Sequence, residues 1–316
     1  MSTTATRAKK RPPPKRPAGR RPAVRRPSPW RRAAPWLAGA VAAMAVIAVV
    51  VTRGGDGSGS GTDGASGSFV GGDLHTLVID PANAQRLFVA GHQAAGTSTD
   101  GGRTWSQVPS LTNADGMGWA FVGDTVWMGG HPGLRRSAAG GDFESAGGEL
   151  SSSDVHGLGG TGGVLYAASP GRGLLASTDD GETWEVRSAE AGQGFMGAIV
   201  VDPADADHLL APDMQAGVVE SRDGGRTWEP LGSPGIAMSV TTVGGSIDDL
   251  VVAGNGQAAR SRDGGQTWAP FEVPEATLVV AGAEDGSLYA AVLDGDVARV
   301  SRSTDDGATW ELLNPT

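Results

Sequence analysis

Short runs of apolar and β-branched residues, separated by turn residues, recur along the chain from residue 69 onward. In one stretch the runs are HTLVID, RLFVAG, AGTST and TWSQV, and a later stretch repeats them as GAIVVD, HLLAP, GVVES and TWEPL. Runs of this length, bounded by Gly, Pro, Asn and Asp, are typical of β-strands. The pattern therefore predicts units of four short strands, here over residues 75–108 and 197–231.

One motif, S-x-D-x-G-x-T-W, marks each unit. It begins at Ser98, Ser177, Ser221, Ser261 and Ser303, with a degenerate copy at Ser137. Successive copies, in chain order, are 39, 40, 44, 40 and 42 residues apart. Such a period with strand and turn punctuation is typical of a β-propeller. We predict an all-β, six-bladed β-propeller over residues 69–316, whose termini close the ring without exchanging a strand.

The motif resembles the Asp box, or BNR repeat, of sialidases, other glycosidases and sortilin-like receptors. In such a turn the Asp accepts hydrogen bonds from backbone N–H groups, the Gly supplies a positive φ and the Trp packs between sheets. A calcium loop is the alternative for an acidic, Gly-rich repeat, but each copy has only one or two carboxylates and lacks a distal Glu. We therefore interpret these Asp-box turns as structural.

The first part of the chain differs from the repeats. Residues 1–32 carry twelve Lys and Arg and no acidic residue, which predicts a disordered basic tail beside anionic lipid. Residues 33–52 predict one transmembrane helix, because their uncharged run is long enough to span roughly 28 Å. Residues 53–68 form a Gly/Ser-rich linker. A cleaved signal peptide is the alternative to a retained anchor, although VVVTRGG offers no small-x-small cleavage site.

Charge then indicates topology and excludes some functions. The net charge of −10 is unevenly distributed along the chain. From residue 54 onward the chain has twelve Arg and all 35 acidic residues, so this part has a net charge of −23. The positive-inside rule places the N-terminus in the cytoplasm and the propeller, which we expect to be monomeric, outside it. Repulsion from phosphate argues against nucleic-acid binding. The absence of Cys excludes disulfides and thiolate metal sites.

Strand direction predicts that four of the five histidines share the face opposite the motif turns. His75 and His156 open the first strands of units one and three, and His92 and His131 follow the second strands of units one and two. His208 lies on the motif face. Imidazoles gathered in adjacent units suggest a site that binds a divalent metal or performs acid–base chemistry. The alternative is that they are ordinary polar residues at strand ends.

Other residues of this face complete the candidate site. Asp115 and Asp154 lie in the links between units, and Asp213 takes a loop position of unit four; these three are the candidate catalytic carboxylates. Met117 and Trp119 occupy positions at the channel mouth, where packing is the alternative to ligand contact. The predicted ligand-binding set is His75, His92, Met117, Trp119, His131 and His156, with any metal held among the four histidines.

The face also resembles a glycosylhydrolase-like family of bacterial Asp-box proteins, whose members carry H-G-L, M-G-F and S-G-H-P segments. The counterparts are His156-Gly157-Leu158, Met117-Gly118-Trp119 and Gly129-Gly130-His131-Pro132. The resemblance implies glycoside hydrolysis, which requires two suitably spaced carboxylates. Sialidase activity is not expected, because the chain lacks an R-I-P motif and its two tyrosines, Tyr166 and Tyr289, lie inside predicted strands.

Together these observations predict a membrane-anchored, extracytoplasmic propeller that hydrolyses or binds a carbohydrate. The alternative is a protein-binding or assembly scaffold, as in sortilin-like receptors and photosystem assembly factors with similar repeats. An enzyme predicts convergent carboxylates or a metal among the histidines, whereas a scaffold predicts a shallow face with aromatic patches.

Overall fold

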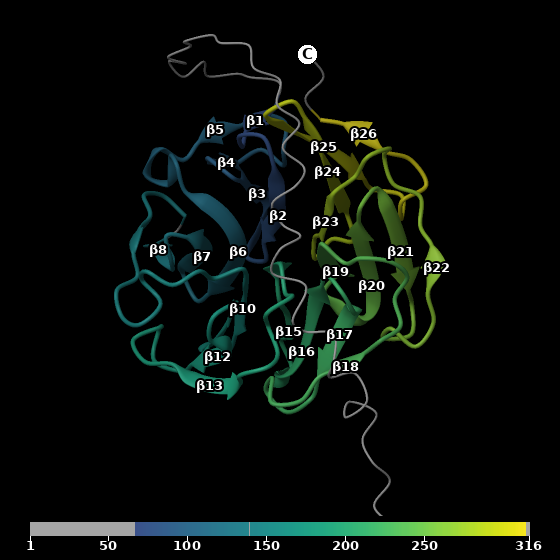
Figure 1. Ribbon diagram of the computed structural model, residues 1–316. Coiled ribbons are helices and arrows are strands. Elements are labelled where there is room, and N and C mark those ends of the chain that lie inside the picture. Colours follow the sequence, from purple (N-terminus) through teal and green to yellow (C-terminus); the bar gives the residue numbers. More distant parts are fainter. Residues whose placement is uncertain (1–66, 139, 314–316) are drawn as a thin grey trace, which may run out of the picture. The chain divides into compact units, whose positions relative to one another are not determined.

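The computed structural model describes residues 67–138 and 140–313, and within them the chain forms six β-sheets arranged around a common centre (Figure 1). This confirms the predicted all-β, six-bladed propeller. The predicted tail, membrane helix and most of the linker lie outside the described residues. In the part that is described, no helix is long and apolar enough to cross a membrane.

Each blade is built on an antiparallel meander, in which a strand pairs with the next strand along the chain. Blade 1 contains β2 (Leu74–Asp80), β3 (Asn83–Gly91), β4 (Ala95–Ser98) and β5 (Ser106–Gln107). A short 3-10 helix, η3 (Pro109–Leu111), leads to blade 2. Blade 2 contains β6 (Asp115–Val122), β7 (Thr125–His131), β8 (Arg135–Ala138) and β9 (Glu144–Ser145). Blade 3 contains β10 (Gly157–Thr161), β11 (Val164–Ser169), β12 (Gly173–Ser177), β13 (Glu185–Ser188) and β14 (Gly197–Ala198).

The remaining blades follow the same plan. Blade 4 contains β15 (Val200–Asp202), β16 (Asp205–Asp213), β17 (Gly217–Ser221) and β18 (Glu229–Pro230). Blade 5 contains β19 (Ser239–Val243), β20 (Ser246–Gly254), β21 (Gln257–Ser261) and β22 (Ala269–Pro270). Blade 6 contains β23 (Val279–Gly282), β24 (Leu288–Asp294), β25 (Val297–Ser303) and β26 (Glu311–Leu312), together with β1 (Ser68–Phe69).

The predicted first strand of blade 4, residues 197–202, is divided between two blades. Its first part, β14, pairs in parallel with β10 of blade 3, and only β15 pairs with β16. Between them, the N–H of Ile199 donates to the carbonyl of Leu158 at 2.9 Å. Gly159 permits this approach, because a Cβ on it would lie 2.1 Å from the Ile199 carbonyl oxygen. The prediction of one continuous strand was therefore wrong.

Ring closure also differs from the prediction. Strand β1 precedes blade 1 in the sequence but pairs antiparallel with β25 of blade 6, with Ser68 opposite Ala298. The outer edge of β25 is thus shared by β1 and β26. The two-residue β26 pairs only with the end of β25 near Ser301, which leaves the other end free to pair with β1. The termini therefore do exchange a strand, contrary to the expectation.

The hydrophobic core is divided among the interfaces between neighbouring blades. Six clusters of buried side chains occur in the described residues, and each joins two adjacent blades. The cluster between blades 6 and 1, for example, contains Leu77 and Val89 from one blade and Val279 and Val300 from the other. Burying such a side chain stabilises the fold by roughly 1.5–3 kcal/mol. The blades therefore depend on each other for their stability.

The S-x-D-x-G-x-T-W turns are held by a repeated set of hydrogen bonds. The Asp100 carboxylate accepts hydrogen bonds from the backbone N–H (2.9 Å) and the hydroxyl (2.7 Å) of Thr104. The Ser98 hydroxyl accepts one from the N–H of Gly102 at 2.9 Å, and the Trp105 indole donates to the Gly102 carbonyl at 3.0 Å. The bonds to the Ser and Asp recur in the copies that begin at Ser177, Ser221, Ser261 and Ser303.

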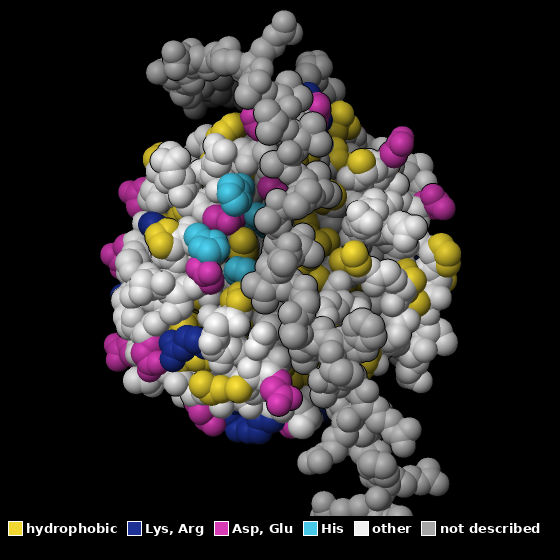
Figure 2. All heavy atoms as spheres, viewed as in Figure 1, with side chains coloured by type: hydrophobic (Ala, Val, Ile, Leu, Met, Phe, Trp, Pro, Cys, Tyr) yellow, Lys and Arg dark blue, Asp and Glu magenta, His cyan; other side chains and the backbone are white. Residues whose placement is uncertain are grey.

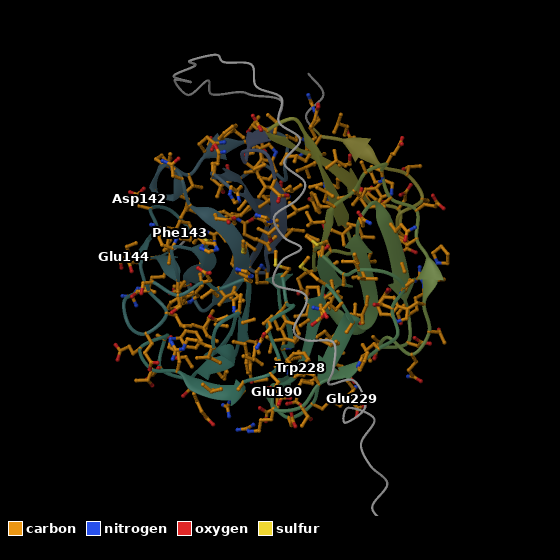
Figure 3. The ribbon with its side chains drawn as sticks, viewed as in Figure 1. Asp142, Phe143, Glu144, Glu190, Trp228 and Glu229 are labelled. Atoms are coloured by element: carbon orange, nitrogen blue, oxygen red, sulfur yellow. The ribbon has the colours of Figure 1, made fainter. Side chains whose placement is uncertain are left out.

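The aromatic residue of each turn packs in the interface with the preceding blade. Trp184, for example, belongs to the cluster between blades 2 and 3, and Trp228 packs at the cluster between blades 3 and 4. The degenerate copy of blade 2 has no Trp, but Phe143, labelled in Figure 3, directly precedes β9 and packs edge-on against Phe88 of blade 1 with ring centroids 6.4 Å apart. Phe143 therefore supplies the interblade contact that Trp supplies elsewhere.

Acid should weaken these turns. Hydrogen bonds from the Thr267 hydroxyl and N–H and from the Ser261 hydroxyl lower the pKa of Asp263 from 3.8 to about 2. Because the pKa is lower in the folded state than in the unfolded state, the stabilisation is complete above about pH 4 and is lost as the pH falls toward 2. We expect the urea midpoint of the wild type to fall across this window. Asp263→Asn should be less stable at neutral pH and show a shallower fall.

The control for this measurement is Asp124→Asn, which changes an exposed carboxylate in the turn between β6 and β7, outside the motif. Its urea midpoint should follow the wild-type pH profile. An Asp263→Asn profile parallel to that of the wild type would contradict the assigned role of the carboxylate.

Removing β1 should destabilise the ring. A chain that begins at residue 72 lacks the pairing with β25, the hydrogen bond from Val70 N–H to the Asp296 carbonyl (2.9 Å) and the contact of Gln107 with Ser68. Each such bond contributes about 0.5–1.5 kcal/mol. We expect its Tm to lie roughly 5–10 °C below that of a chain that begins at residue 67. Equal melting temperatures would show that β1 adds nothing to ring closure.

Candidate functional site

The first strands of the blades surround a central cavity of about 220 Å³. Its lining is mostly apolar or small and includes Gly159, Gly160 and Gly282. Because β2 runs from Leu74 to Asp80, the His75 end of the cavity opens on the face opposite the motif turns. Ligand sites in proteins favour such concave mouths.

Figure 2 shows histidine and acidic side chains gathered in one patch on the face viewed. The described residues contain two groups whose ligand atoms lie within 4.8 Å of one another: the His75 cluster (His75, His92 and Asp115) and the His131 cluster (His131, Asp154 and His156). The sequence-predicted histidines of this face are therefore brought together in two groups, each with one predicted carboxylate.

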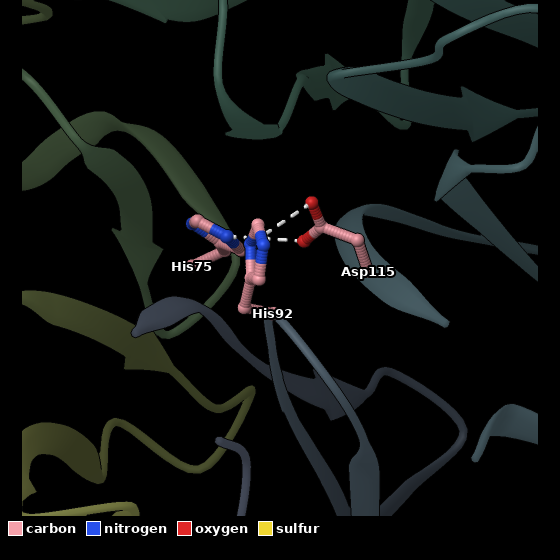
Figure 4. Close-up of side chains that lie close together, drawn as sticks. All are labelled: His75, His92 and Asp115. Carbon is pink, nitrogen blue, oxygen red and sulfur yellow. Dashed lines mark ion pairs between the residues drawn. The ribbon is translucent and has the colours of Figure 1, made fainter. Parts of the chain in front are cut away.

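In the His75 cluster, one carboxylate pairs with two imidazoles (Figure 4). Asp115 Oδ1 lies 3.0 Å from His75 Nε2, and Asp115 Oδ2 lies 3.3 Å from His92 Nδ1. The side chains of His75 and Asp115 are each 8% exposed, whereas His92 is 64% exposed. The cluster therefore joins a buried pair to one residue in contact with solvent.

The residues of the His75 cluster are placed by an irregularity in the backbone of β2 and by the ends of neighbouring strands. His75 is the additional residue of a β-bulge, since Leu74 pairs with Gly91 and Thr76 pairs with Ala90. A bulge changes the direction in which a side chain points and is common beside functional sites. His92 directly follows β3, and Asp115 is the first residue of β6. Three neighbouring strand ends thus supply the three side chains.

The His131 cluster is more open. His131 Nδ1 lies 2.7 Å from Asp154 Oδ1, and these side chains are 49% and 46% exposed. The ring centroids of His131 and His156 are 5.9 Å apart. His131 ends β7, whereas Asp154 and His156 come from the link that leads into β10. Blades 2 and 3 therefore build this cluster jointly.

The two clusters are neighbours on the sheet of blade 2. Asp115 of one cluster and His131 of the other face each other directly in the pairing of β6 with β7. Residues paired in this way have Cβ atoms about 4.5–5.5 Å apart. Gly130 allows the two strand ends to meet, because a Cβ there would lie 1.6 Å from the Asp115 carbonyl oxygen.

Burial and neighbouring charges change the acidity of two histidines. Burial disfavours the charged form of His75, but the adjacent Asp115 and the more distant Asp73 outweigh it and raise its pKa above 6.5. Burial lowers the pKa of His156 below 6.5, and His131 and His75 add to this lowering. His156 is therefore neutral at pH 7, with a lone pair available to an acid or a metal.

Three buried atoms of the clusters lack hydrogen-bond partners among the described residues: His75 Nε2, Asp115 Oδ1 and His156 Nε2. The first two lie only 3.0 Å apart, so their separation is that of a hydrogen bond but their orientation is not. Polar atoms left in this state are costly in a folded protein. The arrangement is instead suited to a third atom bound between them.

His208 provides the contrast within the same chain. Its Nδ1 is hydrogen-bonded to Asp202 at 3.2 Å and its Nε2 to Glu220 at 2.9 Å, so both ring nitrogens are satisfied. Arg86 takes the corresponding position of blade 1 and pairs with Asp80. His208 therefore acts as a structural partner of the turn Asp, as its predicted place on the motif face implies.

The other predicted site residues lie elsewhere or are buried. Trp119 is 2% exposed and stacks on Phe88 with ring centroids 4.8 Å apart, and Met117 is 8% exposed. Packing therefore accounts for Trp119, and its contact with a ligand stays a prediction that no contact supports. Asp213 ends β16 and accepts hydrogen bonds from the backbone N–H groups of Gln215 and Ala216, and it joins neither cluster.

The sequence did not reveal which carboxylate would join which histidines. The available signal was the repeated Gly-His pair at Gly91-His92 and Gly130-His131, where each histidine follows a second strand. The bulge at His75 gave no such signal. The expected packing role of the two tyrosines is confirmed, since Tyr166 and Tyr289 are each 1% exposed.

Comparison with solved structures shows that the chain has the fold of known six-bladed propellers. The GH74 xyloglucanase from Xanthomonas campestris matches with a TM-score of 0.54 and 16% identity, over 79% of this chain and 46% of that chain. A GH74 enzyme from Niastella koreensis matches with a TM-score of 0.54 and 15% identity, over 80% and 47%. YCF48 bound to D1 peptide matches with a TM-score of 0.50 and 17% identity, over 77% and 82%.

At 15–17% identity, these similarities define the fold class of the chain. The chain spans about half the length of the two GH74 enzymes. No protein-family model and no curated protein matches the sequence. The protein is a six-bladed β-propeller with two histidine–aspartate clusters on one face.

Proposed function

We propose that this protein is a membrane-anchored, extracytoplasmic Asp-box propeller that acts on or binds a carbohydrate through the face that carries the two clusters. The five nearly complete S-x-D-x-G-x-T-W turns, with their recurrent hydrogen bonds, support assignment to the Asp-box type. The fold similarity to GH74 enzymes is consistent with a carbohydrate ligand.

The observation that carries this proposal is the convergence of imidazoles and carboxylates in two neighbouring clusters on one face, of which His75 also lines the central cavity. Carboxylates and imidazoles form hydrogen bonds with hydroxyl groups, and carbohydrates present many hydroxyls on a small surface. His92, His131 and Asp154 are exposed enough to meet such a ligand directly. The cluster pair therefore offers polar contacts from three neighbouring blades.

Within this proposal, Asp154 and Asp115 are the carboxylates that hydrolysis would use. Glycoside hydrolysis needs one carboxyl group as an acid and a second as a base or nucleophile. Asp154 is accessible and lies beside His131, whereas Asp115 is buried and pairs with two imidazoles. Asp213, the third candidate carboxylate, accepts hydrogen bonds from the turn at Gln215 and belongs to neither cluster, so its catalytic role stays a prediction.

A protein-binding scaffold is the competing function, and the fold similarity to YCF48 is consistent with it. The scaffold hypothesis predicts aromatic patches on a shallow face. The exposed large hydrophobic side chains of the described residues are dispersed over several elements: Phe69, Val186, Met214, Ile236 and Leu312. Only one of these is aromatic, so the polar ligand is favoured.

A glycan panel tests the proposal. Full-length wild-type protein should bind or hydrolyse at least one polysaccharide, and Asp154→Asn should reduce the measured affinity or rate by roughly 100-fold, the scale of one acid–base group. Asp124→Asn removes an exposed carboxylate from the opposite face and should behave as wild type. A panel without any binding or turnover, or an effect equal in both variants, would refute the carbohydrate assignment.

Topology is tested separately on intact cells. The proposal places residues 1–32 in the cytoplasm and the propeller outside, with residues 33–52 as the anchor. We expect external protease to remove a C-terminal epitope tag and to leave an N-terminal tag intact until the cells are lysed. Loss of the N-terminal tag alone would reverse the orientation. Release of the propeller into the medium would indicate cleavage of the anchor.

A further inference from the structure

We propose that the His75 cluster and the His131 cluster each bind one divalent transition-metal ion, with Zn²⁺ as the reference ion. Each cluster offers two imidazole nitrogens and one carboxylate. This donor set suits Zn²⁺, Cu²⁺, Ni²⁺ or Fe²⁺, whereas Mg²⁺ and Ca²⁺ prefer oxygen ligands alone. The inference concerns the ions themselves and does not depend on the proposed carbohydrate.

The separations of the donor atoms match those around a small ion. Three ligands held about 2.0–2.1 Å from Zn²⁺ in a tetrahedron lie about 3.3 Å from one another. In the His75 cluster, His75 Nε2 lies 3.0 Å from Asp115 Oδ1 and His92 Nδ1 lies 3.3 Å from Asp115 Oδ2, so an ion held by both imidazoles would meet the carboxylate through both of its oxygens. In the His131 cluster, the corresponding distance to Asp154 is 2.7 Å, so this cluster must expand slightly to accept the ion.

The geometry of the buried atoms supports the same conclusion, because His75 Nε2 and Asp115 Oδ1 form an ion pair at 3.0 Å without the orientation of a hydrogen bond. His75 and Asp115 are both more than nine-tenths buried, and His75 Nε2 and Asp115 Oδ1 have no hydrogen-bond partner in the described chain. An ion bound between them would satisfy both atoms at once. In the second cluster, His156 Nε2 is in the same condition.

His208 shows that a histidine beside two acids is not sufficient for such a site. Its two nitrogens form hydrogen bonds in opposite directions, to Asp202 and to Glu220, and leave no lone pair for an ion. In the two clusters, by contrast, the donor atoms of three residues converge within 4.8 Å. His208 is therefore a matched negative control within the chain.

The exposure of each cluster implies incomplete coordination by protein. Three protein ligands leave at least one position of a tetrahedral ion open to water or to a substrate oxygen. His92, at 64% exposure, and His131, at 49%, place that open position toward solvent. The net charge of −23 after residue 54 attracts cations to this part of the molecule.

Metal stoichiometry is the direct test. Full-length protein without a polyhistidine tag, purified in detergent and treated with a chelator, is titrated with Zn²⁺ against a chromophoric competitor and then analysed for zinc after gel filtration. We expect two ions per chain. His92→Ala should leave one tight ion, His131→Ala should leave the other, and the double variant should leave none, each loss weakening binding at the altered site by at least about tenfold.

Both substitutions alter exposed side chains, so folding should be preserved, and thermal melting without metal checks this. Asp115→Asn then tests the buried ligand of the first cluster, and His208→Gln should retain two ions. Absence of bound zinc at micromolar free Zn²⁺ overturns the proposal. If His208→Gln loses as much bound zinc as the cluster variants do, the assignment of the ions to the two clusters is wrong. If His92→Ala and His131→Ala each abolish the same single ion, the assignment of two separate sites is wrong.

Discussion

Apolar contact between neighbouring blades is the interaction on which the rest of the structure depends. A four-stranded sheet exposes two faces, and a blade of this size cannot cover either one alone. The six clusters of buried side chains lie between blades, so each sheet is completed by its neighbours. The motif turns add an aromatic side chain to each interface. In the first copy the Asp100 carboxylate fixes the turn through Thr104, and the Trp105 indole donates to the Gly102 carbonyl.

Because the ring of blades is closed, local departures from regular strand pairing can orient the side chains of the site. The blades fix the ends of β2, β3, β6 and β7 relative to one another, and small departures from regular pairing then orient the polar side chains. The bulge at His75 and the close backbone approach at Gly130 are two such departures. Both would be unfavourable in an isolated sheet, and the surrounding interfaces offset their cost.

The motif period was sufficient to predict the blades, because the Ser, Asp, Gly and Trp positions each have a physical role in one local turn. The pairing of β14 with blade 3 was not predictable in this way, since it depends on Gly159 leaving room for another segment. The crossing of β1 to blade 6 likewise depends on a free edge of β25.

For the site, strand direction correctly grouped the histidines on one face but could not assign partners. Asp115 lies 40 residues after His75 and 23 residues after His92, and no local motif links them. Only the packing of blades 1 and 2 brings its carboxylate into contact with both histidines. Trp119 shows the reverse case. Its position at a strand entrance suggested ligand contact or packing; its ring stacks on Phe88, and Trp119 also lines the central cavity, so ligand contact stays a prediction.

The short strand β1 also determines how mechanical force would enter the ring. Any pull transmitted along the chain from the residues before Ser68 reaches the propeller first through its pairing with Ala298. If these two residues detached, the load would pass to Val70, which is buried in the cluster between blades 6 and 1. A pull on this end of the described chain would therefore act on the closure between blades 6 and 1 before it acts on blades 2 and 3.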